Sequence, residues 1–249
     1  WADKDGAEEA VFNLISDIVI RHKFEDCVDI PANYRYALEY ELPPKHRQMY
    51  EKMETTAILE LKKSKKVITA VNAAVVSGKL LQIASGAVYD DAGEFALVDE
   101  GRYKLVLDLV EERPHSLVFF HWRHQRDALT AEADKRGLSF CVIDGDAKDT
   151  EREEYVKAYQ RGEYRVMFAH PRSAAHGLTL TKGTTTIWAS PTYDLELYEQ
   201  GSKRQHRMGQ TQKTETITIV APGTIDMRAW DVLLTKGARM QNLLELFES

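Results

Sequence analysis

The chain has only two cysteines among its 249 residues, and this scarcity excludes two kinds of site. Cys27 and Cys141 stand alone, without a C-x-x-C spacing, so the sequence supports neither a zinc site nor a disulfide framework. Long apolar runs are missing as well: no stretch is long enough to span a bilayer, and no signal-peptide pattern opens the chain. These absences predict a soluble protein of a reducing, cytoplasmic compartment without a membrane partner.

Positive charge is not in excess, because the formal net charge is −6. A dedicated nucleic-acid-binding domain usually carries a basic surface, so this charge counts against one. It leaves room for a local basic groove, since contact with phosphates needs only a few well-placed lysines and arginines.

Two glycine motifs that cradle phosphates are absent. No strand-like run is followed by G-x-G-x-x-G, which argues against a Rossmann-type nucleotide-binding enzyme, and no G-x-x-x-x-G-K-[ST] loop occurs. Residues 99–102, DEGR, imitate an acidic metal-binding motif. We expect Asp99 and Glu100 to be solvated residues of a loop and a helix start, because acids favour a helix N-terminus. No metal site is predicted.

Apolar runs alternate with helical stretches from Ser116 onward. This order predicts an α/β fold whose parallel sheet is covered by helices on both faces. The expected strands are 117–120, 140–143, 165–168, 185–189 and 216–221, and the expected helices between them are 123–136, 150–160 and 194–208. An amphipathic helix in the first twenty residues, a strand near 34–42, helices at 46–61 and 67–76 and one or two helices over 225–247 complete the expectation.

Segment 200–210, QGSKRQHRMGQ, is the strongest sign of chemistry. On the expected helix, Arg204 and Arg207 lie three positions apart and share a face. Parallel sheets bind ligands at the carboxyl ends of their strands, and we expect the segment to lie there. Two planar, permanently charged guanidiniums at such an edge can clamp a polyphosphate. For two arginines alone, the alternative is a solvated basic helix face.

The same segment resembles motif VI of the Swi/Snf-type ATPases, a branch of the superfamily 2 helicases and DNA translocases. Other segments are similar to family motifs in the right order: 117–129 to motif IV, the stretch around Asp144 to the next strand and helix, and 169–183 to motif V. The passage from IRHKFEDCVDIP to ELPPKHRQMY resembles the start of the second lobe. Nearly the whole chain is covered, with phage and prophage members closest. The motif VI matches are Gln200, Arg204, His206, Arg207, Gly209 and Gln210.

The resemblance implies a RecA-like second lobe of a two-lobed, DNA-dependent ATPase, encoded by a phage and acting in the cytoplasm of a bacterial host. The opening at Trp1 rather than at a methionine agrees with a fragment. The missing first lobe is expected to hold ATP and Mg²⁺. The chain divides into a connector from the first lobe (1–33), a strand and helices that start the second lobe (34–115), the core with motifs IV to VI (116–222) and bracing helices (223–249).

The resemblance also implies roles for single residues. Arg204 and Arg207 are expected to be catalytic arginine fingers that enter the ATP site of the first lobe, with Gly177 and Gln200 contacting ATP beside them. Double-stranded DNA is expected to be tracked through its phosphates. We expect the isolated fragment to be a monomer that does not hydrolyse ATP. The expected DNA contacts are Arg123, Gly145, His170, Ser173 and Thr179.

An alternative from another class stays open. A non-catalytic α/β module, derived from such an ATPase, would bind nucleic acid or a protein partner without turning over ATP. The sequence upstream of Trp1 separates the two hypotheses. A phosphate loop and a D-E-x-H motif there favour the ATPase, and their absence favours the binding module.

Overall fold

A six-stranded parallel sheet lies at the centre of the computed structural model, which describes residues 6–15, 17–18, 29–63, 70–90, 92–174 and 177–245. The strand order is β1-β8-β7-β4-β6-β5, and every pairing is parallel. All six expected strands form, with bounds within a few residues of the prediction. They are β1 (Asn33–Glu39), β4 (Ser116–Phe119), β5 (Phe140–Ile143), β6 (Val166–Ala169), β7 (Thr185–Trp188) and β8 (Thr214–Val220).

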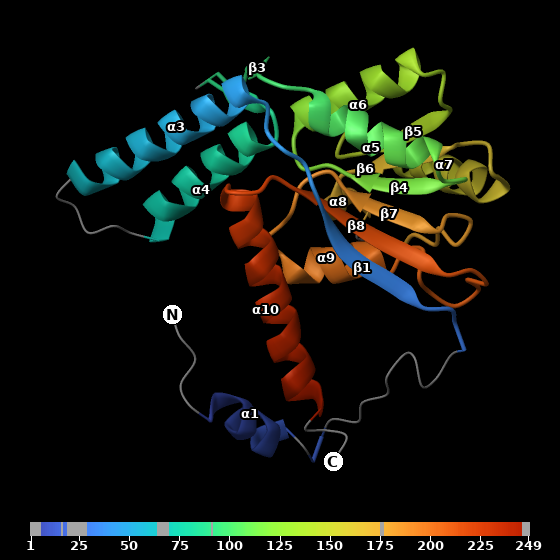
Figure 1. The fold of residues 1–249 in the computed structure, drawn as a ribbon. Helices are drawn as coiled ribbons and strands as arrows, with labels where there is room; N and C mark the ends of the chain where they lie inside the picture. The colour runs from blue at the N-terminus through green and yellow to red at the C-terminus, as the bar shows by residue number, and fades with distance from the viewer. Residues whose placement is uncertain are drawn as a thin grey trace.

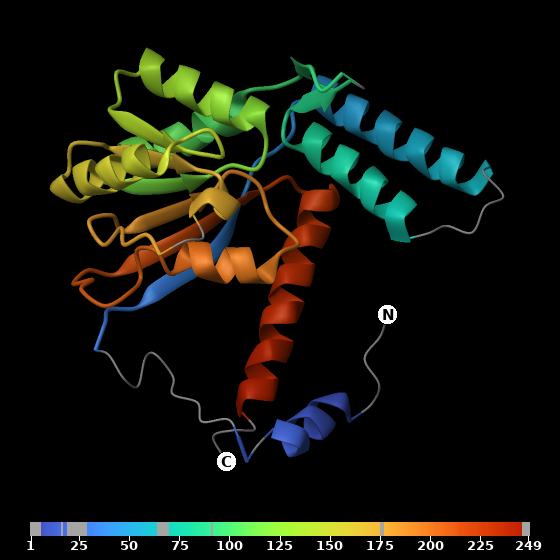
Figure 2. The same cartoon turned by 180° about the vertical axis from the view of Figure 1, so that it is seen from behind.

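Helices cover both faces of this sheet (Figures 1 and 2). Successive side chains of a strand point to opposite faces, so Val118 packs against α5 and α6 while Leu117 packs on the side of α7 and α9. Both side chains are fully buried. The predicted α/β fold with a sheet covered on two sides is therefore confirmed. These helices are α5 (Gly101–Glu111), α6 (Arg123–Lys135), α7 (Asp149–Arg161) and α9 (Leu195–Ser202).

Two long helices, α3 (Pro44–Lys63) and α4 (Ala70–Ala84), form a hairpin that reaches out beside the sheet (Figure 1). Their base packs on α10 (Ile225–Glu245) through a small apolar cluster that includes Tyr50, Ile83 and Ile225. The first residues of the helix expected at 67–76 lie outside the described ones, and α4 runs from Ala70 to Ala84. In the first twenty residues, α1 covers Ala7–Ile15. The division into four segments stays a prediction, although β1 belongs to the same sheet as the core.

The helix expected over 194–208 is wrong in its second half, because α9 ends at Ser202. Gly201, in its last turn, packs so closely on the sheet that a Cβ there would lie 2.8 Å from the rings of Phe119 and Trp188. Beyond it the backbone bonds to other segments, since Leu180 N donates to Arg204 O at 3.0 Å. Arg204 and Arg207 therefore lie on a loop and do not share a helix face.

Asp99 is a second correction, because it is not solvated. Its side chain is only 16% exposed, accepts a hydrogen bond from Tyr40 Oη and lies 3.7 Å from His46 Nδ1. Burial opposes ionisation of this carboxyl, yet the nearby His46 and the hydrogen bond from Tyr40 hold its pKa below the ordinary value. The preceding apolar residues form an unpredicted hairpin of β2 (Ala87–Tyr89) and β3 (Phe95–Leu97). Glu100 is exposed and precedes α5, as expected.

A buried ion pair, which the sequence did not reveal, ties the fold together. Arg102 and Asp226 are 1% and 0% exposed, and their side chains meet at 2.6 Å. Arg102 also donates to the carbonyls of Ala84, Ala189 and Ile219, at 3.0, 3.2 and 3.3 Å. One side chain thus joins α5 to α4, to the carboxyl ends of β7 and β8, and to α10.

Candidate functional site

A groove of about 430 Å³ opens at the carboxyl ends of β4, β5 and β6, and we call it the carboxyl-edge groove. It is lined by four of the five residues expected to contact DNA: Arg123, Gly145, His170 and Ser173. The first two follow β4 and β5, and the other two follow β6, with Ser173 on the short helix α8 (Pro171–Ala174). Parallel strands end at one edge, so residues far apart in the sequence come together there.

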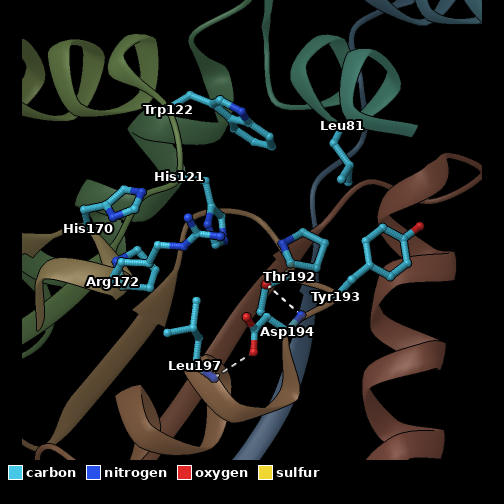
Figure 3. A pocket seen from close by; sticks show the side chains of 11 residues that line it. Leu81, His121, Trp122, His170, Arg172, Thr192, Tyr193, Asp194 and Leu197 are labelled. Atoms are coloured by element: carbon cyan, nitrogen blue, oxygen red, sulfur yellow. Dashed lines mark hydrogen bonds between the residues drawn. The ribbon is translucent and has the colours of Figure 1, made fainter. Parts of the chain in front are cut away.

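A second hollow, of about 360 Å³, adjoins the groove and shares His121, Trp122, His170 and Arg172 with it. Figure 3 shows these side chains facing the loop that leads into α9. Asp194 caps that helix, because its Oδ1 accepts a hydrogen bond from Leu197 N at 3.1 Å (Figure 3). The two hollows thus adjoin along the carboxyl edge, from α6 to the start of α9.

The groove carries basic side chains that the sequence reasoning did not select. Arg172 is exposed, and Arg126 lies one turn after Arg123 on α6. Arg126 Nη1 donates to Asp144 Oδ2 at 2.8 Å, which partly neutralises it, while the guanidinium of Arg123 donates to the carbonyl of Gly93. Two signals could have found them: the i,i+3 spacing from Arg123 for Arg126, and the position three residues after the end of β6 for Arg172.

Two histidines at the back of the groove are neutral near pH 7. Burial, with His170 nearby, lowers the pKa of His121 to about 4. Burial and the charge of Arg172 lower the pKa of His170 below its ordinary value. Positive charge in this groove therefore comes from arginines and not from these two imidazoles.

Residues 203–210, which we call the arginine loop, lie at the opposite edge of the sheet. Arg207 Nη1 donates to Leu178 O, and Gln210 Nε2 donates to Gly183 O, both at 3.0 Å. Gly183 lies two residues before the start of β7, which places the loop at the amino ends of the strands. The expectation of a carboxyl-edge position is therefore wrong for motif VI. The reason is that α9 runs back antiparallel to the strands before the loop begins.

The two arginines of this loop are close enough to affect each other's charge. Arg204 is half-buried, and burial together with the charge of Arg207 lowers its pKa. Both causes disfavour the guanidinium cation. An anion placed between the two side chains would offset the repulsion and accept hydrogen bonds from both.

Buried side chains of the loop itself hold it in place. Gln210 is 4% exposed, and its Nε2 also donates to Thr181 O and Gln205 O, at 3.1 and 3.2 Å. His206, 8% exposed, has Nε2 2.9 Å from Pro31 O ahead of β1. The loop is thus held in one shape by buried hydrogen bonds, which agrees with a structural role for His206.

The remaining predicted residues divide between the two edges. Gly177 is exposed with a φ of 62° and adjoins Leu178, so it belongs with the arginine loop. Thr179 lies between two residues that bond to that loop, and it is not in the carboxyl-edge groove with the other four candidate DNA contacts. Gln200 sits in α9 and donates to Glu196 at 2.9 Å.

Comparison with known proteins agrees with this architecture. Residues 101–209 match the helicase conserved C-terminal domain. The chain is 31% identical over 240 residues to "Putative protein p41" of Acyrthosiphon pisum secondary endosymbiont phage 1, covering 93% of the chain and 50% of that protein. It is 26% identical over 225 residues to the human DNA annealing helicase and endonuclease ZRANB3, covering 90% and 20%.

Solved structures show the same fold. The SWI2/SNF2 ATPase core of Sulfolobus solfataricus in complex with dsDNA has a TM-score of 0.65 at 16% identity, over 92% of this chain and 50% of that one. The chain carries a helicase conserved C-terminal domain and has the RecA-like fold of the C-terminal lobe of SWI2/SNF2 ATPases. As the motifs predicted, a phage protein is among the relatives of this lobe.

The lobe spans half the length of the phage relative and a fifth of ZRANB3. Across the described residues, its helices are too short or too polar to cross a membrane. The described part of the lobe also contains no group of three or more His, Cys, Asp and Glu side chains placed to hold a metal ion.

Proposed function

We propose that this lobe belongs to an ATP-dependent DNA translocase, in which it supplies Arg204 and Arg207 to ATP held by another lobe. Closure of the two lobes would complete the site, and repeated closure would move the protein along the DNA backbone. The single observation that carries the proposal is the pair of like-charged guanidiniums, half-buried on a loop that buried glutamines fix.

The arginine loop suits the charge of a phosphoryl group. Its two arginines repel each other, and the charge that develops on phosphate oxygens in the transition state would relieve this repulsion. The loop is already held in place, so little rearrangement is needed at the moment of reaction. Such arginines contribute roughly three to five powers of ten to turnover in related chemistry.

The lobe alone offers too little to hold ATP and magnesium. The sequence has no phosphate loop, and the described residues hold no cluster of metal ligands. We therefore assign the triphosphate and the magnesium ion to the other lobe, which agrees with the part of its relatives that this chain spans.

The carboxyl-edge groove supplies the contact with DNA in this proposal. Arginine side chains and exposed backbone at Gly145 suit phosphate oxygens, which carry no sequence information. The Sulfolobus relative of the same fold was solved with double-stranded DNA, which supports duplex DNA as the ligand. With a net charge of −6, the isolated lobe should bind it weakly and with a steep salt dependence.

Phosphate release from ATP, measured on the purified 249-residue chain with and without duplex DNA, tests whether hydrolysis requires the other lobe. We expect no turnover above the buffer in either condition, and turnover once the neighbouring lobe is present in the same protein. DNA-stimulated hydrolysis by this chain alone would contradict the proposal. No hydrolysis by the two-lobed protein would favour a binding module.

A further inference from the structure

A buried contact joins the arginine loop to the end of α7. Gln205 is 1% exposed: its Oε1 accepts a hydrogen bond from Thr186 Oγ1 at 3.0 Å, and its Nε2 donates to Tyr159 Oη at 3.1 Å. Tyr159, fully buried, lies in the last turn of α7. Because water does not reach these groups, losing one partner would leave the other unsatisfied.

Gly183 shows how tightly this contact is packed. A Cβ at this position would lie 2.1 Å from Tyr159 Oη and 2.2 Å from Gln205 Nε2, which no side chain tolerates. The tyrosine, the glutamine and the backbone ahead of β7 therefore interlock. The arginine loop has little freedom to shift relative to α7 while this contact is intact.

The other end of α7 is bonded to the carboxyl-edge groove. Arg152, in the first turn, donates from Nη2 to Asp144 O at 2.9 Å and from Nε to Ala147 O at 3.0 Å. These two carbonyls flank Gly145, which lines the groove. The 13 residues of α7 span about 20 Å, so one helix is bonded to both edges of the sheet.

We propose that Gln205 and Tyr159 are positioning residues that lock the arginine loop to α7, so that contact of DNA with the groove is transmitted along α7 to Arg204 and Arg207. Both side chains are buried, so each would act through the loop rather than by direct contact with ATP or DNA. Packed side chains joined by a rigid helix are the kind of network that carries such coupling. This inference rests on the proposed function, since it concerns regulation of the same arginines.

Turnover of the two-lobed protein, measured with and without saturating duplex DNA, tests the coupling. Gln205→Ala and Tyr159→Phe should each lower DNA-stimulated kcat by about tenfold or more, because a small displacement of a catalytic group costs that much. Basal turnover should fall less, so the ratio of stimulated to basal turnover drops. The KM for ATP and the affinity for DNA should stay within roughly twofold of the parent.

Tyr155→Phe is the matched control. Tyr155 lies one turn earlier on α7 and packs on Tyr164, with ring centroids 6.2 Å apart, away from the loop. This variant should keep the parent's stimulation ratio. The double variant Gln205→Ala, Tyr159→Phe should lose no more stimulation than the worse single one, because the two side chains form one link. Tyr159→Phe keeps the ring and supplies the test if Gln205→Ala does not fold.

A purely structural role would lower thermal stability while leaving the stimulation ratio at the parent's value, and that result would overturn the inference. Arg204→Ala, assayed in parallel, separates this failure from failure of the proposed function. If Arg204→Ala loses turnover while the folded Tyr159→Phe variant keeps full stimulation, only the coupling is wrong. If Arg204→Ala itself keeps turnover, the proposed function is wrong.

Discussion

The two edges of the sheet differ in how their polar residues are held. At the carboxyl edge, Arg123 and Arg172 are exposed on a groove about 430 Å³ in volume. At the amino edge, the arginines are half-buried, and Gln205 and Gln210 fix their loop at 1% and 4% exposure. An open groove can follow a polymer that slides past it, whereas a fixed pair of like charges suits one small anion. The difference indicates separate tasks for the two edges.

Breaking the arginine loop should have the largest effect. In the two-lobed protein, Arg204→Ala and Arg207→Ala should each lower turnover by about a thousandfold or more. Lysine at either position should not rescue, because an ammonium group cannot make the planar, forked contact of a guanidinium. ATP affinity should fall much less than kcat, since the contact matters in the transition state. Steady-state kinetics with thermal melts check this, with exposed Arg161→Ala as the control.

Removing Asp226 should lower the stability of the fold. Asp226→Ala leaves the Arg102 guanidinium buried without its carboxylate, which should cost about 3–5 kcal/mol of stability. Replacing both residues by leucine should be less harmful than the single change, because no charge stays buried. Denaturant titrations of the three proteins measure this. A single variant as stable as the parent would show that the pair contributes nothing.

The stability of the fold should fall with decreasing pH because of a buried histidine at the carboxyl edge, at pH values where the carboxylates are still ionised. His124 is fully buried between Ser85 Oγ and Tyr89 Oη, at 3.0 and 2.9 Å, and burial lowers its pKa to about 3. The unfolded chain binds the proton near pH 6.5, so stability is complete above that pH and declines as the pH falls toward 4. His124→Gln should flatten this decline. Melting temperatures between pH 7 and 4 provide the measurement, and equal slopes would contradict the assignment.

The smallest effect is expected at the groove. Arg123→Ala should weaken duplex binding severalfold for every sequence tested and reduce the slope of log affinity against log salt by about one. Turnover at saturating DNA should stay near the parent's. Titrations of two unrelated duplexes at several salt concentrations check both statements. A loss confined to one sequence would indicate base recognition instead.

Much of the fold could be predicted because its signals are local. Four-residue apolar runs between helical stretches marked β4 to β7, and the motif order placed the candidate residues on strand ends. The end of α9 could not be predicted, because it depends on Gly201 fitting against two rings from distant strands. Buried Arg102 and the Tyr159–Gln205 contact were hidden for the same reason: both join residues more than 40 positions apart.

The candidate site was likewise predictable where its signals are local and not where it depends on the arrangement of distant elements. Sequence similarity selected Arg123, Gly145, His170 and Ser173, and the structure brings these four into one groove. Sequence similarity did not show that motif VI lies at the opposite edge of the sheet from this groove. That placement arises because α9 runs back antiparallel to the strands. The order of motifs gives their positions along the sequence. The edge of the sheet on which a motif lies depends on the direction in which the preceding helix or strand runs.

The most direct test of separate tasks is a crossed measurement on Arg123→Ala and Arg204→Ala in the two-lobed protein. For each, the dissociation constant for duplex DNA and the DNA-saturated turnover are measured under one set of conditions. The account predicts that Arg123→Ala weakens DNA binding and keeps turnover, while Arg204→Ala loses turnover and keeps DNA binding. If either variant loses both properties in parallel while staying folded, the two edges do not act separately.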